Sequence, residues 1–172
     1  MSLVTTALEY ALLAIHVVGL PALFVVFVLK GALVGKLLPT SVVLSGYVAV
    51  TAPDYRGAAV VVLLVTVAYL IGQFALYAGS RRYGKRVVSV VPYVDLDPTS
   101  EQFLRVERWF DQYGGAAVFT TNVFPWTRGL IVIPAGVSAY PCRRYLFHAS
   151  TSALLYHGVY VGLPLLGLSL LT

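Results

Sequence analysis

The hydrophobic positions along the chain form long runs of two kinds, and the first kind is unbroken. Residues 57–80 contain no Asp, Glu, Lys or Arg, and an arginine closes the run at each end. A helix of this length rises about 36 Å, enough for the roughly 30 Å hydrocarbon core of a bilayer. Residues 145–172 are equally free of those four residue types, and residues 3–29 are apolar up to a break at Gly19 and Pro21. This pattern predicts about three full transmembrane helices.

The second kind of run is interrupted in its middle by proline, glycine and basic residues. These runs occupy residues 22–52 and 115–142. A straight helix through the second run would place Arg128 near the bilayer centre, at a cost of at least about 2.5 kcal/mol. Each limb of about ten residues spans roughly 15 Å, which is half a bilayer. We therefore predict two re-entrant helical hairpins, with breaks at Pro39, Pro125, Pro134 and Gly136.

The basic residues predict how these segments are oriented. Eight of the twelve lysines and arginines lie in the clusters 81–86 and 143–144 or in the polar segment between them, at Arg105 and Arg108. If residues 115–142 enter the membrane and return, both clusters face the cytoplasm, as the positive-inside rule prefers. The two hairpins then open to opposite sides. The N-terminus and the loop 80–114 are predicted to be cytoplasmic, in a multi-pass protein of the cell membrane.

One segment between the basic clusters has the pattern of an amphipathic helix. Residues 97–101 combine helix-capping residues with acids, and Gly114 and Gly115 follow the last periodic residue. Phe103, Val106, Phe110 and Tyr113 recur at helical spacing. We predict a helix at about 99–113 on the membrane surface. The expected fold is an all-α integral membrane protein in which residues 1–172 form a single polytopic domain.

The composition agrees with this fold and narrows the function. The chain is 59% hydrophobic and 11% charged, whereas a soluble domain is about one quarter charged. The net charge of +5 sits beside apolar segments, which argues for membrane orientation and against nucleic-acid binding. One cysteine permits no intrachain disulfide. We find no motif for metal binding, cofactor binding or catalysis. We therefore expect neither a metal nor a cofactor, and we do not predict an enzyme.

Arg128 is the strongest candidate for a binding residue. A guanidinium inside a broken hairpin needs an anionic partner, and its planar fork matches phosphate or carboxylate, although it could instead bind free carbonyls of the hairpin. In the opposite hairpin, Thr40 and Ser41 can cap a half-helix whose N–H groups attract anions, or can serve capping alone. Lys36 belongs to this site or extends to the interface. The histidines, His157 among them, are expected to form interhelical hydrogen bonds.

Three stretches of the chain resemble the DedA family, also called SNARE-associated or VTT-domain proteins. The most specific is Phe124-Pro125-x-x-Arg128 followed by Ile133-Pro134-Ala135-Gly136, which is similar to the family's second hairpin. Gly72-Gln73 with the turn Arg81-Arg82-Tyr83-Gly84 resembles its central span, and Pro39-Thr40-Ser41 is a weaker match to its first hairpin. The resemblance implies a multi-pass protein with two facing re-entrant hairpins, and members of this family are lipid translocases.

The sequence departs from the family pattern at Ser41, Gln73 and Asn122, where charged residues are usual. The joint loss of charge weakens the case for proton coupling more than the case for anion binding. We therefore expect a flippase or scramblase for a lipid phosphate, either polyprenyl phosphate or phospholipid, with weak or no proton coupling. The expected substrate-binding residues are Arg128, Asn122, Thr40, Ser41, Lys36 and Gln73. The alternatives are an intramembrane lipid phosphatase or transferase, and a structural or regulatory membrane protein. The expected partners are membrane lipids, and a homo-oligomer is left open.

Overall fold

The chain folds into a bundle of helices in its computed structural model, which describes residues 19–34, 39–84, 86–87, 99, 101–124 and 127–170. Within these residues the structure contains helices and no strands, so the all-α prediction is confirmed. The predicted first span, Lys36 and Pro125 lie outside the described residues. The helices are α2 (Leu20–Gly31), α3 (Thr40–Thr51), α4 (Tyr55–Tyr83), α5 (Glu101–Tyr113), α6 (Gly115–Val123), α7 (Val132–Val137) and α8 (Cys142–Ser169).

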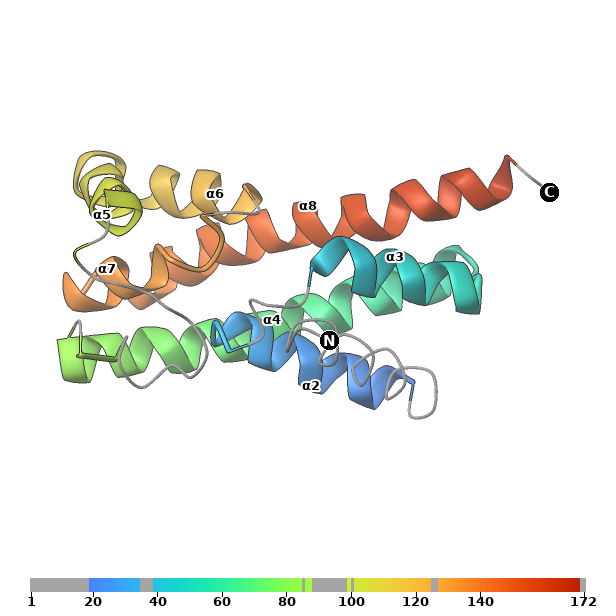
Figure 1. The fold of residues 1–172 in the computed structure, drawn as a ribbon, viewed down its shortest axis with the longest axis horizontal. Coiled ribbons are helices and arrows are strands. Elements are labelled where there is room, and N and C mark those ends of the chain that lie inside the picture. Colours follow the sequence, from blue (N-terminus) through green and yellow to red (C-terminus); the bar gives the residue numbers. More distant parts are fainter. Residues whose placement is uncertain are drawn as a thin grey trace, which may run out of the picture.

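Two long antiparallel helices, α4 and α8, run along the bundle (Figure 1). At the start of α4 the Asp54 carboxylate accepts a hydrogen bond from the Gly57 N–H at 2.8 Å, a typical N-cap. The helix ends at Gly84, whose φ of 63° favours glycine. Of the described helices, α4 is the one long and apolar enough to cross a membrane. The other predicted spans stay predictions.

Two helical hairpins pack against this central pair from opposite ends. α2 and α3 approach from the end where α4 begins, and α6 and α7 approach from the end where α8 begins (Figure 1). α2 packs on α4 and α3 on α8, while α6 packs on α8 and α7 on α4. Each hairpin therefore contacts both long helices, and the two halves of the chain follow one plan. That the hairpins re-enter a bilayer stays a prediction.

Two of the predicted helix breaks are placed wrongly. Pro134 and Gly136 lie inside α7. Pro134 is accommodated because it occupies the first turn, where an N–H has no partner within the helix. At Gly136 a Cβ atom would lie 2.7 Å from the Tyr77 carbonyl oxygen, so this glycine permits the close approach of α7 to α4. Pro39 does mark the boundary between hairpin limbs, since it directly precedes α3.

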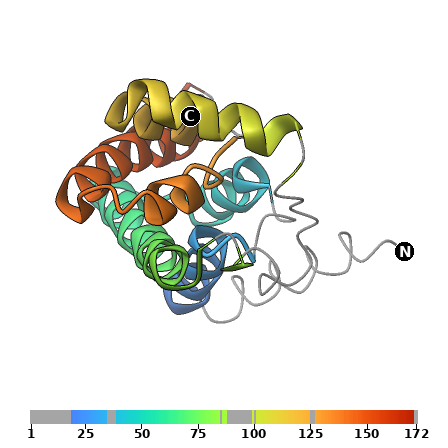
Figure 2. The ribbon, with the colours of Figure 1, turned by 90° about the vertical axis from the view of Figure 1, so that its left-hand side faces the viewer.

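The helix α5 crosses one end of the bundle, transverse to α4 and α8 (Figure 2). Its Val106 and Phe110 side chains are buried, whereas Arg105 and Arg108 are exposed. This helix was expected at 99–113 and is observed two residues shorter at its start. Both basic clusters lie at the same end, because α4 ends and α8 begins there. The direction of α5 and its position at the basic end of the bundle are compatible with a helix that lies on a membrane surface.

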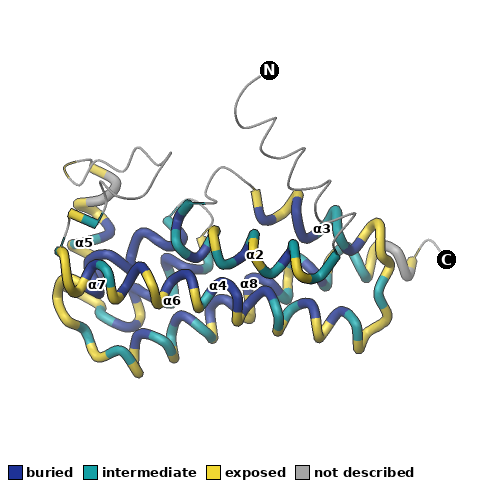
Figure 3. Tube along the Cα trace, turned by 90° about the horizontal axis from the view of Figure 1, so that it is seen from below, coloured by how far each residue is buried: buried dark blue, intermediate teal, exposed yellow. Residues whose placement is uncertain are grey.

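Glycines set the spacing between α2 and α4. A Cβ atom at Gly31 would lie 2.0 Å from the Tyr69 carbonyl oxygen, and one at Gly72 would lie 2.0 Å from the Val28 carbonyl oxygen. The two backbones therefore touch, as small residues allow at helix crossings in membranes. Buried positions run along the inner faces of the long helices (Figure 3). They form two apolar clusters, one at each end of the bundle, with a group of polar side chains between them.

Candidate functional site

The turn that joins α6 to α7 places Arg128 inside the protein. Three backbone hydrogen bonds between residues three positions apart tighten this turn, including the one from Val132 N to the Gly129 carbonyl at 3.3 Å. Gly129 has a φ of 81°, a conformation that favours glycine. The Thr127 hydroxyl donates to the Thr121 carbonyl at 3.1 Å and anchors the turn to α6. The result is an arginine that is only 8% exposed, at the tip of a hairpin.

Two tyrosine rings enclose the Arg128 guanidinium. Its Cζ atom lies 4.2 Å from the centre of the Tyr69 ring on α4 and 3.7 Å from the centre of the Tyr156 ring on α8. Cation–π contacts at these distances hold the plane of the guanidinium in one orientation. Its Nη2 lies 2.9 Å from His157 Nε2, whereas its buried Nη1 has no hydrogen-bond partner among the described residues.

The hydrogen bonds of His157 fix its protonation. Arginine only donates, so the His157 Nε2 beside it must accept. The proton of the neutral ring is then on Nδ1, which donates to the Thr66 hydroxyl at 3.0 Å. This hydrogen bond joins α8 to α4, and it confirms the expected interhelical role of this histidine. His157 therefore adds no positive charge and holds Arg128 in place.

A second network, centred on Gln73, lies beside the first. The Gln73 amide donates to the Tyr69 hydroxyl at 2.9 Å and to Asn122 Oδ1 at 3.2 Å, and it accepts from the Tyr145 hydroxyl at 3.1 Å. Asn122 Oδ1 also accepts from the Gly129 N–H at 3.4 Å. The buried Asn122 Nδ2 has no partner among the described residues. Two of the predicted site residues, Gln73 and Asn122, are therefore joined to Arg128 through Tyr69 and the turn.

The charge of the site is positive and not balanced by a described acid. Lys30 on α2 lies close enough to Arg128 for the two like charges to interact. The buried polar side chains include no carboxylate within the part of the chain that the structure describes. No group of residues suited to a metal ion occurs there either. Two buried donors, Arg128 Nη1 and Asn122 Nδ2, thus have no acceptor among the described residues, and each is of the kind that a ligand with only hydrogen-bond acceptors would satisfy.

The first hairpin contributes less to the site than expected. Thr40 is buried, with its hydroxyl beside the Tyr156 phenol, so it lies next to the ring that covers Arg128. Ser41 is exposed. Capping of α3 by these residues is contradicted: Pro39 occupies the N-cap position, and no side chain caps the helix. Because Thr40 is already helical, its side chain packs against α8 and does not point back over the helix start. Lys36 lies outside the described residues.

Sequence reasoning missed the residues that position Arg128. Tyr69, Tyr156 and Thr66 were assigned to packing or not singled out, and His157 was not placed in the site. One signal was present for Tyr69. It precedes Gln73 by four residues in the charge-free run, so both lie on the same face of a helix. The positions of Tyr156 and His157 depend on how α8 meets α4, which sequence spacing alone does not specify.

Comparison with known proteins relates this site to a family. Residues 38–163, well over half of the chain, match the family model described as "VTT domain". Undecaprenyl phosphate transporter A of Staphylococcus aureus (strain NCTC 8325 / PS 47) is 27% identical over 128 residues, which cover 70% of this chain and 60% of the relative. Undecaprenyl phosphate transporter A of Bacillus subtilis (strain 168) is 28% identical over 78 residues, 45% of this chain and 35% of the relative.

The chain therefore spans between about a third and three fifths of the lengths of these two relatives. No solved structure matches it.

Proposed function

This chain belongs to the VTT-domain (DedA) family of membrane proteins, and we propose that it carries a phosphate-bearing lipid across the bilayer. The observation that supports this function best is a pair of buried donors, Arg128 Nη1 and Asn122 Nδ2, that have no acceptor in the part of the chain the structure describes. At neutral pH the oxygens of a phosphate accept hydrogen bonds, and those donated by a guanidinium are charge-assisted and strong. The two relatives are named as transporters of such a lipid.

In the proposed complex, the phosphate binds against the free edge of the Arg128 guanidinium. Asn122 Nδ2 donates to a second phosphate oxygen, and Lys30 on α2, which interacts electrostatically with Arg128, adds a positive charge when the anion binds. Tyr69, Tyr156 and His157 hold the guanidinium so that Nη1, and not another edge, is presented. Asn122 thus donates a hydrogen bond to the phosphate through Nδ2, while its Oδ1 accepts from the Gly129 N–H and holds the turn in place.

The position of the site suits a lipid whose head group must cross the membrane while its tail does not. We propose that the two hairpins re-enter the bilayer from opposite sides, so that their tips meet near the midplane. Non-helical backbone is tolerated at that depth where it is buried in protein. The hydrocarbon tail stays in the surrounding lipid, and only the phosphate exchanges water for the polar side chains between the two apolar clusters.

We further propose that transport is weakly coupled or uncoupled to protons. Coupling needs a group inside the membrane that gains and loses a proton during the cycle, and carboxylates usually fill this role. Apart from Lys30, the polar side chains described near Arg128 are amides, hydroxyls and a histidine that accepts from arginine. Ser41, Gln73 and Asn122 are neutral at positions where the family resemblance implies charges, so charged members of such a relay are not expected there.

The test is a transport assay with the purified protein in vesicles. A fluorescent prenyl monophosphate is distributed over both leaflets, and an impermeant reductant is added outside. We expect the protein to expose the inner-leaflet label to the reductant, at a rate that an imposed pH gradient does not change. A zwitterionic phospholipid probe is the control for non-specific leakage. Protection of the inner label equal to that in protein-free vesicles contradicts the function. A rate that follows the gradient contradicts uncoupled transport, and release of free phosphate indicates a phosphatase.

His157 should act by positioning Arg128. The substitution His157→Leu removes the acceptor of the Nη2 hydrogen bond, so the guanidinium loses one of its three constraints. We expect prenyl monophosphate binding to weaken about tenfold, the effect of one net hydrogen bond. His157→Gln keeps an acceptor oxygen and should restore most of the affinity. Affinity is measured by titration of the lipid into detergent-solubilised protein. Equal affinities of the Leu and Gln variants would argue against positioning through this hydrogen bond.

A further inference from the structure

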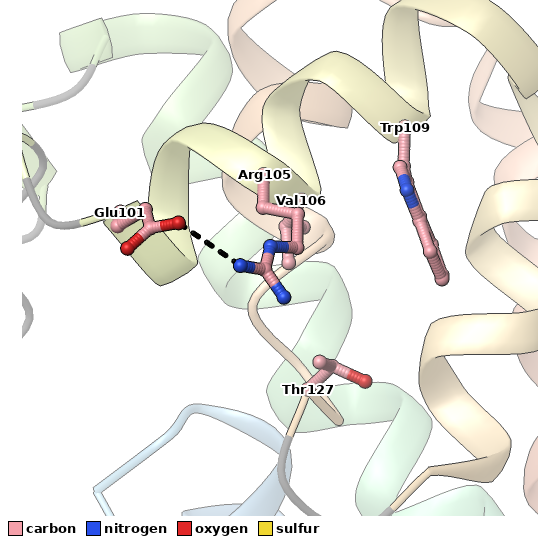
Figure 4. A pocket seen from close by; sticks show the side chains of 5 residues that line it. All are labelled: Glu101, Arg105, Val106, Trp109 and Thr127. Carbon is pink, nitrogen blue, oxygen red and sulfur yellow. Dashed lines mark hydrogen bonds and ion pairs between the residues drawn. The ribbon is translucent and has the colours of Figure 1, made fainter.

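A second pocket lies between α5 and the tip of the second hairpin. Glu101, Arg105, Val106, Trp109 and Thr127 line it, and its volume is about 320 Å³. Figure 4 shows the Arg105 and Trp109 side chains extending from α5 toward Thr127, with Glu101 at one side. Pockets for small molecules range from about 300 to 1,000 Å³. The space therefore accommodates a lipid head group and not a whole lipid. We call this pocket the α5 vestibule.

The side chains of the α5 vestibule suit a phosphate at a membrane surface. Arg105 donates to Glu101 at 3.0 Å, one helical turn away, and both side chains are well exposed. Exposed pairs of this kind are weak, so an incoming phosphate can displace the carboxylate from the guanidinium. Trp109 is 42% exposed, and its indole adds an N–H donor on an amphipathic ring of the kind found at bilayer interfaces.

The α5 vestibule and the buried site are lined by neighbouring residues of the chain. Thr127 lines the vestibule, and the next residue, Arg128, points into the protein between Tyr69 and Tyr156. The same end of the bundle carries the basic clusters at the end of α4 and the start of α8. The positive charge at this end attracts a phosphate, and Arg105 is exposed there whereas Arg128 is buried.

From this arrangement we infer that the α5 vestibule is a docking site for the phosphate head group of an anionic membrane lipid, occupied before the lipid passes to Arg128. The inference rests on the proposed transport function and adds a second binding step to it. Arg105 supplies the charge, Trp109 contacts the lipid at the level of the head group, and Thr127 marks the passage to the buried site. Glu101 competes with the phosphate for Arg105 and keeps the docking step weak enough for release.

The transport assay separates docking from the buried site. Arg105→Gln should raise the lipid fraction needed for half-maximal transport about three- to tenfold, as expected for one lost charge-assisted contact, and leave the maximal rate unchanged. Glu101→Gln should lower it about twofold, because Arg105 loses its competitor. Arg108→Gln is the matched control, since Arg108 is exposed on the same helix but does not line the pocket. Equal values for the two arginine variants would overturn the inference while leaving transport itself intact.

A fluorescence titration identifies the ligand directly. The chain has two tryptophans, so Trp126→Phe leaves Trp109 as the single reporter. We expect nanodiscs containing a prenyl monophosphate to change the Trp109 emission, and the change to be lost with Arg105→Gln. Inorganic phosphate at the same concentration should have no effect, because it lacks the membrane-anchored tail. An equal response to inorganic phosphate would overturn a lipid-specific site. An unchanged emission with the lipid, or a response that persists in Arg105→Gln, would overturn docking at α5.

Discussion

Replacing Arg128 with Gln should reduce transport of a prenyl monophosphate at least about thirtyfold, because removing one partner of a buried charged hydrogen bond costs about 2–5 kcal/mol. The Gln side chain fits the space but brings no charge and no fork of donors. Arg128→Lys should rescue little of the loss. A lysine keeps the charge, but it lacks the planar group that both tyrosine rings hold and the second donor edge. The initial rate of reductant access in reconstituted vesicles measures both variants.

An isosteric change at Asn122 provides the matched test. Asn122→Asp retains the oxygen that accepts from Gln73 and Gly129, and replaces the Nδ2 donor, which has no partner among the described residues, with a negative oxygen at the turn that carries Arg128. We expect lipid phosphate binding to fall as far as in Arg128→Gln, with the thermal stability unchanged or raised. Binding and transport near wild-type levels in both variants would rule out this phosphate site. A loss confined to unfolded protein would be detected by comparing melting temperatures.

The substitution Gly72→Ala should have the largest effect on stability. Its new methyl group would lie 2.0 Å from the Val28 carbonyl oxygen and 2.6 Å from the Ala32 nitrogen, both backbone atoms that cannot turn aside. α2 would have to move away from α4 along their whole crossing. We expect a loss of about 3 kcal/mol, at the upper end of overpacking effects. In a protein of this size that corresponds to a melting temperature lower by about 6–12 °C.

Gly158→Ala is the control for the Gly72 variant. Gly158 lies within α8, and a Cβ atom there would have no heavy atom within 4 Å. The change raises helix propensity without a clash, so we expect an unchanged or slightly higher melting temperature. Thermal unfolding in one detergent measures both proteins. Equal melting temperatures for the two variants would show that α2 does not pack on α4 through these backbones.

The sequence predicts elements well where one local rule decides them. The charge-free run at 57–80 became α4, and the spacing of Val106 and Phe110 gave the buried face of α5. Arg128 could be singled out because an arginine among apolar residues has few explanations. Pro39 marked a boundary correctly. Pro134 did not, since a proline in the first turn of a helix and one that breaks a helix look alike in a sequence.

What the sequence does not predict are the contacts made between helices. The enclosure of Arg128 by Tyr69 and Tyr156 joins residues far apart in the chain, and it depends on the rotation of α4 and α8 about their axes. The hydrogen bond from His157 to Thr66 links positions 91 residues apart. Capping of α3 by Thr40 was wrong for a related reason: the side chain is taken up by packing against α8, a tertiary contact that outweighs the local preference.

The packing of each hairpin on both long helices restricts how the protein can move. Each hairpin has one limb on the long helix of its own half and the other limb on the long helix of the opposite half. The two halves are interlocked, so neither can rock as a rigid body without breaking packing on both α4 and α8. Close-packed interfaces resist such gradual deformation. We therefore propose that a head group passes by local displacement of single hairpin limbs, and not by rocking of one half of the chain against the other.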